Sequence, residues 1–89
     1  MATDRKRRIF CSQVARILRE ERQKRGLSMT VVAERAGLSQ QMVGYVEREI
    51  RTPGLDTLLR ITDAIGVEVA DVVVRASDAT NSTSRAKAK

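Results

Sequence analysis

The segment 28–48 constrains the fold more than any other part of the sequence, because it predicts two short helices joined by a tight turn. Ser28 and Ser39 are both well placed as N-caps, since a serine hydroxyl can accept a backbone N–H left unpaired at the start of a helix. Gly37 lies between the two helices and can take the positive φ that a sharp turn needs. Helices this short are stable only when they pack against each other and against the rest of the chain.

The apolar side chains of this segment fall on the inner faces of the two predicted helices, residues 29–36 and 40–48. They are Val32, Ala33, Ala36, Leu38, Val43 and Val46. The small side chain of Ala33 lets the two helices cross closely. The pattern therefore predicts that the second helix lies across the first, with its outer face projecting from the protein.

Two further helices are predicted on either side, at about residues 5–25 and 55–65. Gly26 follows the first directly and can take the left-handed conformation that ends a helix. Pro53 disfavours helical angles in the residue before it, so a loop precedes the second. The apolar stripe of helix 5–25 comprises Ile9, Phe10, Val14, Ile17 and Leu18. Helix 55–65 is expected to bury Leu55, Leu58, Leu59, Ile61 and Ile65.

The stretch 67–74 is compatible with two interpretations. Its alternating and β-branched valines favour a strand. A short fifth helix over residues 69–73 would instead close a helical bundle, and we favour the helix. Residues 76–89 contain no large apolar side chain and are expected to be disordered. The predicted organisation is one domain over residues 1–75 followed by a disordered basic tail.

Composition narrows the class of protein. Lys and Arg number 17 against 11 Asp and Glu, which gives a formal charge of +6 over 89 residues. Such a surplus favours a polyanionic partner, although a basic tail on a soluble domain would give the same value. No apolar run approaches the roughly 18–20 residues needed to cross a bilayer. No secretory signal is visible either, so a cytoplasmic location is expected.

Cysteine and histidine content limits the chemistry. Cys11 is the one cysteine and there is no histidine, so neither a disulfide within the chain nor a Cys/His zinc site can form. Cys11 is expected to pack as a small apolar residue on a helix face. The sequence also has no glycine-rich phosphate loop and no nucleophile beside a base. We therefore expect no cofactor, no metal and no enzymatic activity.

A series of short motifs runs in order through residues 14–73. They are Leu18-Arg19, Arg22, Gly26-Leu27-Ser28, Val32-Ala33-Glu34-Arg35-Ala36-Gly37-Leu38-Ser39, Val43, Val46-Glu47, Thr52-Pro53, Leu55, Leu58-Leu59 and Ala64-Ile65-Gly66-Val67. None is specific alone, but their order and spacing resemble the phage repressor and Cro type of helix-turn-helix, a large family of bacterial and phage regulators. The resemblance implies an all-α, five-helix, lambda-repressor-like domain that binds double-stranded DNA. It also implies a nucleoid-associated protein encoded by a bacterium or a phage.

The resemblance also implies which residues contact DNA. The base-reading positions of the family fall on Gln40, Gln41, Gly44 and Tyr45. Glutamine can pair with N6 and N7 of adenine in the major groove. The alternatives are a solvated helix start for the two glutamines and packing against helix 55–65 for Tyr45. The phosphate-binding positions fall on Ser28, Thr30, Ser39, Arg48, Arg51 and Thr52.

Three residues depart from the pattern of the family. Met29 stands where a phosphate-binding glutamine is usual, so one contact is lost. Gly44 lies inside a helix at a cost of up to about 1 kcal/mol; either it lets the helix approach DNA closely or it is merely tolerated. Glu49 replaces the usual glycine at the end of helix 40–48, so that end is expected to differ or to run longer.

Arg22 and Glu47, by contrast, match the family: they fall where it has a pair that forms a partly buried salt bridge.

Basic residues lie at both ends of the chain. Arg5, Lys6, Arg7 and Arg8 precede the usual start of the first helix. They are either an arm that reaches DNA phosphates or the minor groove, or a solvated helix end badly placed against the helix dipole. The same two interpretations apply to Arg85, Lys87 and Lys89 in the tail, which either add non-specific attraction to DNA or are simply solvated.

One recognition helix contacts only about 4–5 base pairs, so we expect a homodimeric repressor on a palindromic operator. The two recognition helices would lie about 34 Å apart in successive major grooves. The expected dimer surface consists of Val69, Val72, Val73 and Val74, with Ile9 and Phe10 as further candidates. Two alternatives stay open. One is a protein-interaction module that binds a toxin or a polymerase subunit, with DNA binding secondary; the other is non-specific binding to the nucleoid or to RNA.

Overall fold

The computed structural model describes the backbone of residues 2–88 and the side chains of residues 4–83. The described backbone contains helices joined by turns and loops, with no strand, which confirms the all-α prediction and decides between helix and strand after residue 67. The helices are α1 (Ala2–Lys24), α2 (Met29–Ala36), α3 (Gln40–Glu47), α4 (Leu55–Ile65) and α5 (Val69–Ala88).

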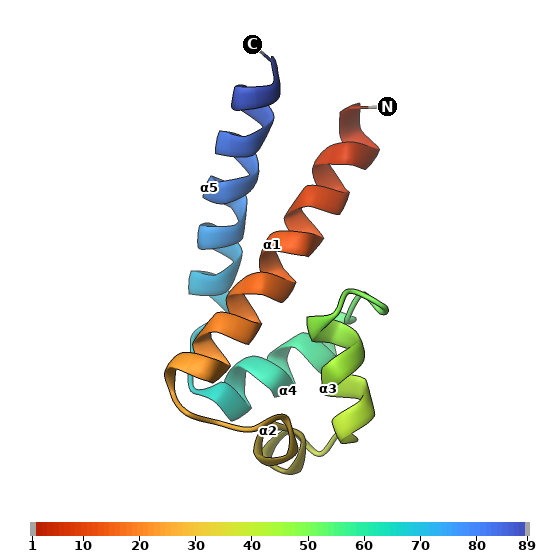
Figure 1. Cartoon of the computed structure of the whole chain (residues 1–89), viewed down its shortest axis with the longest axis vertical. Helices are drawn as coiled ribbons and strands as arrows, with labels where there is room; N and C mark the ends of the chain where they lie inside the picture. The colour runs from red at the N-terminus through yellow and green to blue at the C-terminus, as the bar shows by residue number, and fades with distance from the viewer. Residues whose placement is uncertain (1, 89) are drawn as a thin grey trace.

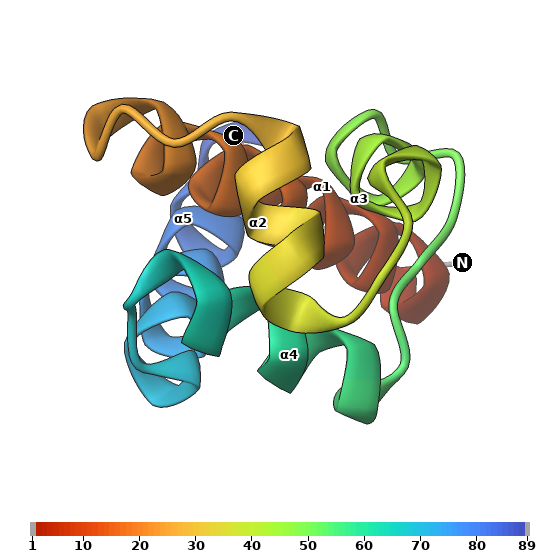
Figure 2. The same cartoon turned by 90° about the horizontal axis from the view of Figure 1, so that it is seen from below.

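The two long helices, α1 and α5, lie side by side and run in opposite directions, so that both described ends of the chain lie at one end of the molecule (Figure 1). The three short helices gather around the other end of α1. Figure 2 shows α2 in front, with the turn at its end leading directly into α3 and with α4 beneath it. Helix α2 packs against both α3 and α4, and α1 packs against α3.

The predicted caps position the short helices. The Ser28 hydroxyl accepts the N–H of Val31 at 3.1 Å, and the Ser39 hydroxyl accepts the N–H of Met42 at 3.0 Å. Gly37 has φ 69° and ends α2 with a Schellman motif, in which the N–H of Leu38 bonds the Ala33 carbonyl at 2.9 Å. The turn between α2 and α3 is therefore fixed by a backbone hydrogen bond where α2 ends and by the Ser39 cap where α3 begins.

The core is built mainly from aliphatic side chains of all five helices. It includes Ile17, Leu18, Val32, Ala33, Val43, Val46, Leu58, Ile61, Ile65 and Val72. Two predicted core residues are wrong: Leu55 and Leu59 are exposed. The buried face of α4 follows the spacing of Leu58, Ile61 and Ile65, and no element covers the side on which the other two leucines lie. Cys11 is also exposed, contrary to the expectation that it packs.

The prediction of a disordered tail from residue 76 is wrong, because α5 continues to Ala88. Ala76 and Thr80 are fully or almost fully buried on the face that α5 turns toward the protein. Thr80 also donates its hydroxyl proton to the Ala76 carbonyl at 2.6 Å. Small side chains let two helix backbones approach closely, so this part of α5 packs without any large apolar residue. The side chains of Arg85, Lys87 and Lys89 lie outside the described residues.

Glu21 connects α1 to the first part of α5. Its buried carboxylate accepts hydrogen bonds from Arg25 and, at 3.0 Å, from Nη1 of Arg75. The hydrogen bond from Arg25 lowers the pKa of Glu21 most strongly, burial opposes it, and Arg75 lowers the pKa further. The charged form of this carboxylate is therefore favoured in the folded protein relative to the unfolded chain.

This ion cluster predicts a pH dependence of stability. Because the folded pKa of Glu21 lies below the unfolded value, its contribution is fully present above the unfolded pKa and is lost as the pH falls through the folded pKa. In urea titrations, Glu21→Gln is expected to be less stable than the wild type at neutral pH, with a difference that shrinks as the solution is acidified. A difference that stays constant down to acid pH would contradict this account.

Glu49 ends α3 with a backbone conformation that favours glycine. Its φ is 63°, and it is the one non-glycine residue with positive φ among the described residues. The N–H of Ile50 bonds the Tyr45 carbonyl at 2.8 Å, and the N–H of Glu49 bonds the Val46 carbonyl at 3.2 Å. This is the Schellman motif that a glycine would form. The departure from the family pattern therefore changes the residue but keeps a glycine-like end, and α3 does not run longer.

Glu49→Gly is expected to raise the free energy of unfolding by about 0.5–1 kcal/mol, because it removes the left-handed strain. The Glu49 carboxylate also accepts a hydrogen bond from the Ser12 hydroxyl on an exposed surface. Ser12→Ala, which removes only that bond, is the control and should change stability little. Urea denaturation of the three proteins tests this; a destabilised Glu49→Gly would contradict it.

Candidate nucleic-acid interface

An ion pair between α1 and α3 holds α3 in place. Arg22 Nε donates to Glu47 Oε2 at 2.7 Å, and Arg22 Nη2 donates to Glu47 Oε1 at 2.9 Å. The Arg22 side chain is 12% exposed and that of Glu47 is 5% exposed. Arg22 Nη1 also donates to the Leu27 carbonyl at 2.9 Å, just before α2. These two residues form the pair that the resemblance implies, and the bonds join α1, α3 and the turn before α2.

The two glutamines that open α3 are exposed, and each makes one hydrogen bond within the protein. Gln40 Oε1 accepts from the Thr30 hydroxyl of α2 at 3.0 Å. Gln41 Nε2 donates to Tyr45 Oη at 2.5 Å, one helical turn along. Tyr45 is half-buried, and the Arg51 guanidinium lies 6.0 Å from the centre of its ring. Three of the four predicted base-reading residues thus share one outer face of α3.

The fourth predicted base-reading residue, Gly44, lies beneath the side chain of Arg48. It is buried, and a Cβ atom at this position would meet Arg48 Nη2 at 3.1 Å. Its backbone is therefore accessible to a ligand only when the Arg48 side chain moves. Because that contact is with the far end of a flexible side chain, an added methyl group would displace Arg48 at little cost.

Gly44→Ala separates the two interpretations of this glycine. Alanine is favoured over glycine inside a helix by about 1 kcal/mol, so the variant is expected to be more stable by roughly 0.5–1 kcal/mol. If α3 needs the glycine for close approach to DNA, the same variant binds duplex more weakly in fluorescence anisotropy. A variant that is more stable and binds equally well would show that Gly44 is merely tolerated.

The six predicted phosphate-binding residues are all exposed. They are Ser28, Thr30, Ser39, Arg48, Arg51 and Thr52. The hydroxyls of Ser28 and Ser39 accept backbone N–H groups as caps, which leaves their own protons free to be donated. Met29 is half-buried and packs against the core, so it offers no polar group to a phosphate. The polar groups therefore lie at the N-terminus of α2, along α3 and in the loop that follows it.

The basic residues before position 9 are not an extended arm. Arg5, Lys6, Arg7 and Arg8 are exposed and lie within α1, which the solvated-helix interpretation predicts. Asp4 forms an ion pair with Arg7 and places one acidic group in the first turn. That group partly offsets the unfavourable position of four cations at the positive end of the helix dipole.

The four valines expected at the dimer surface differ in how far they are exposed to solvent. Val72 lies in the core and is fully buried, so it cannot contact a partner. Val69 is half-buried against the core. Val73 and Val74 are exposed on α5. Only two of the four valines are therefore available at the surface.

Arg60, which was not among the predicted site residues, supports the turn before α3. Its Nη1 donates to the Ala36 carbonyl at 3.2 Å, and its Nε donates to Asp56 at 2.8 Å. The four-residue spacing of Asp56 and Arg60 was the available signal, because it predicts an ion pair along a helix. Nothing in the sequence indicated that the same guanidinium reaches the C-terminus of α2.

The described residues hold no cluster of three or more side chains suited to a metal ion. None of the helices within that part of the chain is long and apolar enough to cross a membrane.

Comparisons with known proteins agree with this geometry. A family model described as helix-turn-helix matches residues 18–72. An uncharacterized HTH-type transcriptional regulator, present in two strains of Mycobacterium tuberculosis, is 37% identical over 59 residues, covering 66% of this chain and 42% of the relative. Another from Sinorhizobium fredii is 36% identical over 67 residues, covering 75% of this chain and 82% of the relative. The chain thus spans less than half the length of the mycobacterial relatives. No solved structure gives a significant match.

Proposed function

Because the chain belongs to the helix-turn-helix family, we propose that it is a sequence-specific regulator of transcription that binds double-stranded DNA. The observation that carries this proposal is the outer face of α3, where Gln40 and Gln41 are exposed at the helix start. Glutamine amides can donate to and accept from adenine in the major groove. The largely buried pair of Arg22 and Glu47 ties α3 to α1 and would hold that face in place, as specific contacts require.

The residues around α3 would fix the protein on the duplex without determining sequence. Arg48, Arg51 and Thr52 are exposed at the end of α3 and in the following loop, while Ser28 and Ser39 present hydroxyls at two helix N-termini. Such groups bind phosphate oxygens and set the register of the recognition helix. The net charge of +6 would add attraction that falls as salt rises.

The protein would act as a homodimer on a palindromic operator, since one helix of this length contacts only about 4–5 base pairs. Two copies related by a two-fold axis would place their α3 helices about 34 Å apart, one turn of DNA. Repression is the regulatory outcome that occupancy of a site produces by itself, because bound protein excludes other proteins from the same DNA.

Selection of bound sequences from a random duplex pool tests this function. The expected result is an enriched palindrome whose half-sites are about one helical turn apart. A failure to enrich any sequence, with binding that disappears as salt rises, would leave only backbone electrostatics. That outcome would overturn sequence-specific regulation and favour a protein-interaction module.

A further inference from the structure

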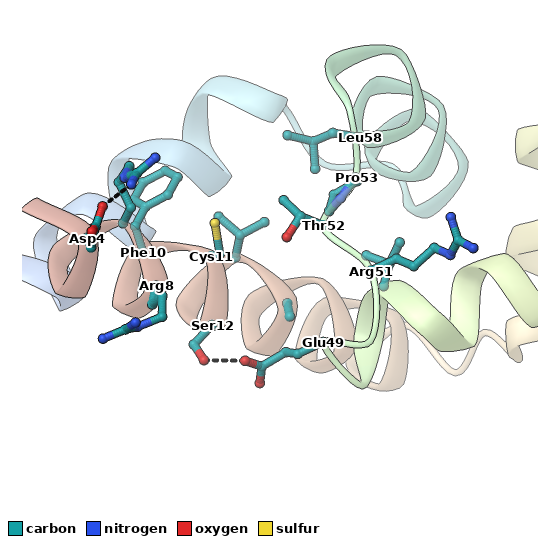
Figure 3. A pocket seen from close by; sticks show the side chains of 14 residues that line it. Asp4, Arg8, Phe10, Cys11, Ser12, Glu49, Arg51, Thr52, Pro53 and Leu58 are labelled. Carbon is teal, nitrogen blue, oxygen red and sulfur yellow. Dashed lines mark hydrogen bonds and ion pairs between the residues drawn. The ribbon is translucent and has the colours of Figure 1, made fainter.

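A groove of about 830 Å³ lies between the N-terminal half of α1 and the loop that joins α3 to α4 (Figure 3). Its apolar lining includes Phe10, Cys11, Val14, Val46, Pro53 and Leu58. The described residues that line it come from three separate segments. An apolar groove of this size on so small a domain is a surface that a partner side chain would fill.

The groove has a charged rim on its α1 side. Asp4, Arg7 and Arg8 line this rim, and Asp4 is paired with Arg7. No described side chain forms an ion pair with Arg8, whose guanidinium projects outward from α1 in Figure 3. Arg51 lines the opposite side, but its guanidinium points away toward α3. The rim therefore offers a cation beside an apolar floor.

The same loop leads into a ridge of exposed apolar side chains with an acid beside them. We define the α4 ridge as Leu55, Asp56 and Leu59. Leu55 is 80% exposed and Leu59 is 44% exposed, while the Asp56 side chain is 82% exposed. Ile50, in the loop itself, is 60% exposed. Two large aliphatic side chains exposed one helical turn apart, as Leu55 and Leu59 are, indicate an interaction site.

We propose that the α4 ridge of one copy occupies the groove of a second copy of this chain, with Leu55 on the apolar floor and Asp56 facing Arg8. This inference rests on the homodimer of the proposed function and identifies its interface. A two-fold axis beside the loop makes the contact reciprocal, because a surface that holds both the groove and the ridge is complementary to itself. Each dimer then buries two leucine anchors and two opposite-charge contacts.

One observation favours a second copy over DNA in this groove, and another favours this interface over one on α5. A DNA backbone would use the arginines but not the apolar floor, whereas Leu55 matches the floor. Asp56 pairs with Arg60 of its own helix at 2.8 Å, and its side chain, still 82% exposed, can also face the cation. The alternative surface on α5 presents only two exposed valines to a partner, Val73 and Val74, because Val72 is buried.

The first test is sedimentation velocity of the full chain, free and on the selected palindromic duplex. Leu55→Asp is expected to weaken dimer association on the order of a hundredfold or more, since each of the two symmetric contacts loses its anchor. The side chain is exposed and aspartate suits the first turn of a helix, so folding should be unchanged by circular dichroism. Val74→Asp on α5, where Val74 is 56% exposed, is the matched control and should dimerise like the wild type.

The second test uses the native thiol in the groove. Cys11 is exposed and lines the floor, so Leu55→Cys would place a second thiol beside it across the interface. Mild oxidation is expected to give a covalent dimer that disappears in the Leu55→Cys, Cys11→Ser double variant. Val74→Cys should not cross-link to Cys11. Peptide mapping of the bridged product identifies the two linked positions.

The outcomes separate this interface from the proposed function. A palindrome bound by a dimer that Val74→Asp breaks and Leu55→Asp does not would overturn the interface and leave sequence-specific binding intact. A wild type that stays monomeric at high micromolar concentration and binds its operator as one copy would overturn both the interface and the homodimer. The absence of any selected sequence, with a dimer that Leu55→Asp still breaks, would retain the interface and overturn only the DNA-binding function.

Discussion

Replacement of Glu47 by alanine is expected to lower the free energy of unfolding by about 3–5 kcal/mol, because it leaves the charge of Arg22 buried without a partner. Both side chains are largely buried, and two hydrogen bonds of 2.7 and 2.9 Å join them. Arg22 has one further acceptor, the Leu27 carbonyl, which cannot neutralise its charge. The effect should be among the largest of any single polar substitution in this chain.

Urea denaturation measures this loss, with Glu20→Ala as the matched control. Glu20 pairs with Arg16 at 2.8 Å on the exposed side of α1, so its removal should cost no more than about 0.5–1 kcal/mol. The double variant Arg22→Met, Glu47→Leu should recover much of the loss, since apolar residues of similar size need no partner. A cost for Glu47→Ala as small as that of the control would contradict the structural role of the pair.

The double variant Gln40→Ala, Gln41→Ala is expected to lose discrimination between the operator and unrelated DNA. Each bidentate contact between a glutamine and an adenine is worth about 1–3 kcal/mol of discrimination, so two contacts amount to roughly thirtyfold to twenty-thousandfold in each half-site. Affinity for unrelated duplex and the slope of affinity with salt should stay unchanged, because the phosphate-binding side chains are retained.

Fluorescence anisotropy on the selected operator and on a scrambled duplex measures both quantities. Gln23→Ala is the matched control, since Gln23 is an exposed glutamine near the end of α1, outside the proposed DNA-binding face. Its affinity and discrimination should equal those of the wild type. Equal losses on operator and scrambled duplex in the double variant would show that these glutamines do not determine sequence.

The parts of the fold that local chemistry determines could be predicted from the sequence. Ser28, Gly37 and Ser39 specify where α2 begins, where it ends and where α3 begins, because caps and turns depend on nearby backbone groups. The bounds of α2 and α4 are those predicted, and α3 ends one residue earlier. The pairing of Arg22 with Glu47 came from family resemblance, since nothing local in the sequence joins residues 25 positions apart.

The errors arise where tertiary packing decides the outcome. The prediction of a disordered tail treated the absence of large apolar residues as the absence of a core, but Ala76 and Thr80 are buried because small side chains allow α5 to approach closely. The apolar pattern of α4 suggested that Leu55 and Leu59 are buried, yet no element covers that side. The sequence likewise could not show that Arg48 lies over Gly44.

Recognition of adenine by the start of α3 is tested most directly by binding of the wild type and of the double variant Gln40→Ala, Gln41→Ala to two forms of the selected operator. One form is the unmodified operator. In the other form the adenines opposite α3 are replaced by 7-deazaadenine, which lacks the N7 acceptor of the major groove but still pairs with thymine. The wild type should bind this form about tenfold or more weakly, while the double variant should bind both forms equally. An equal loss in both proteins, or no loss in the wild type, would contradict recognition of adenine by the start of α3.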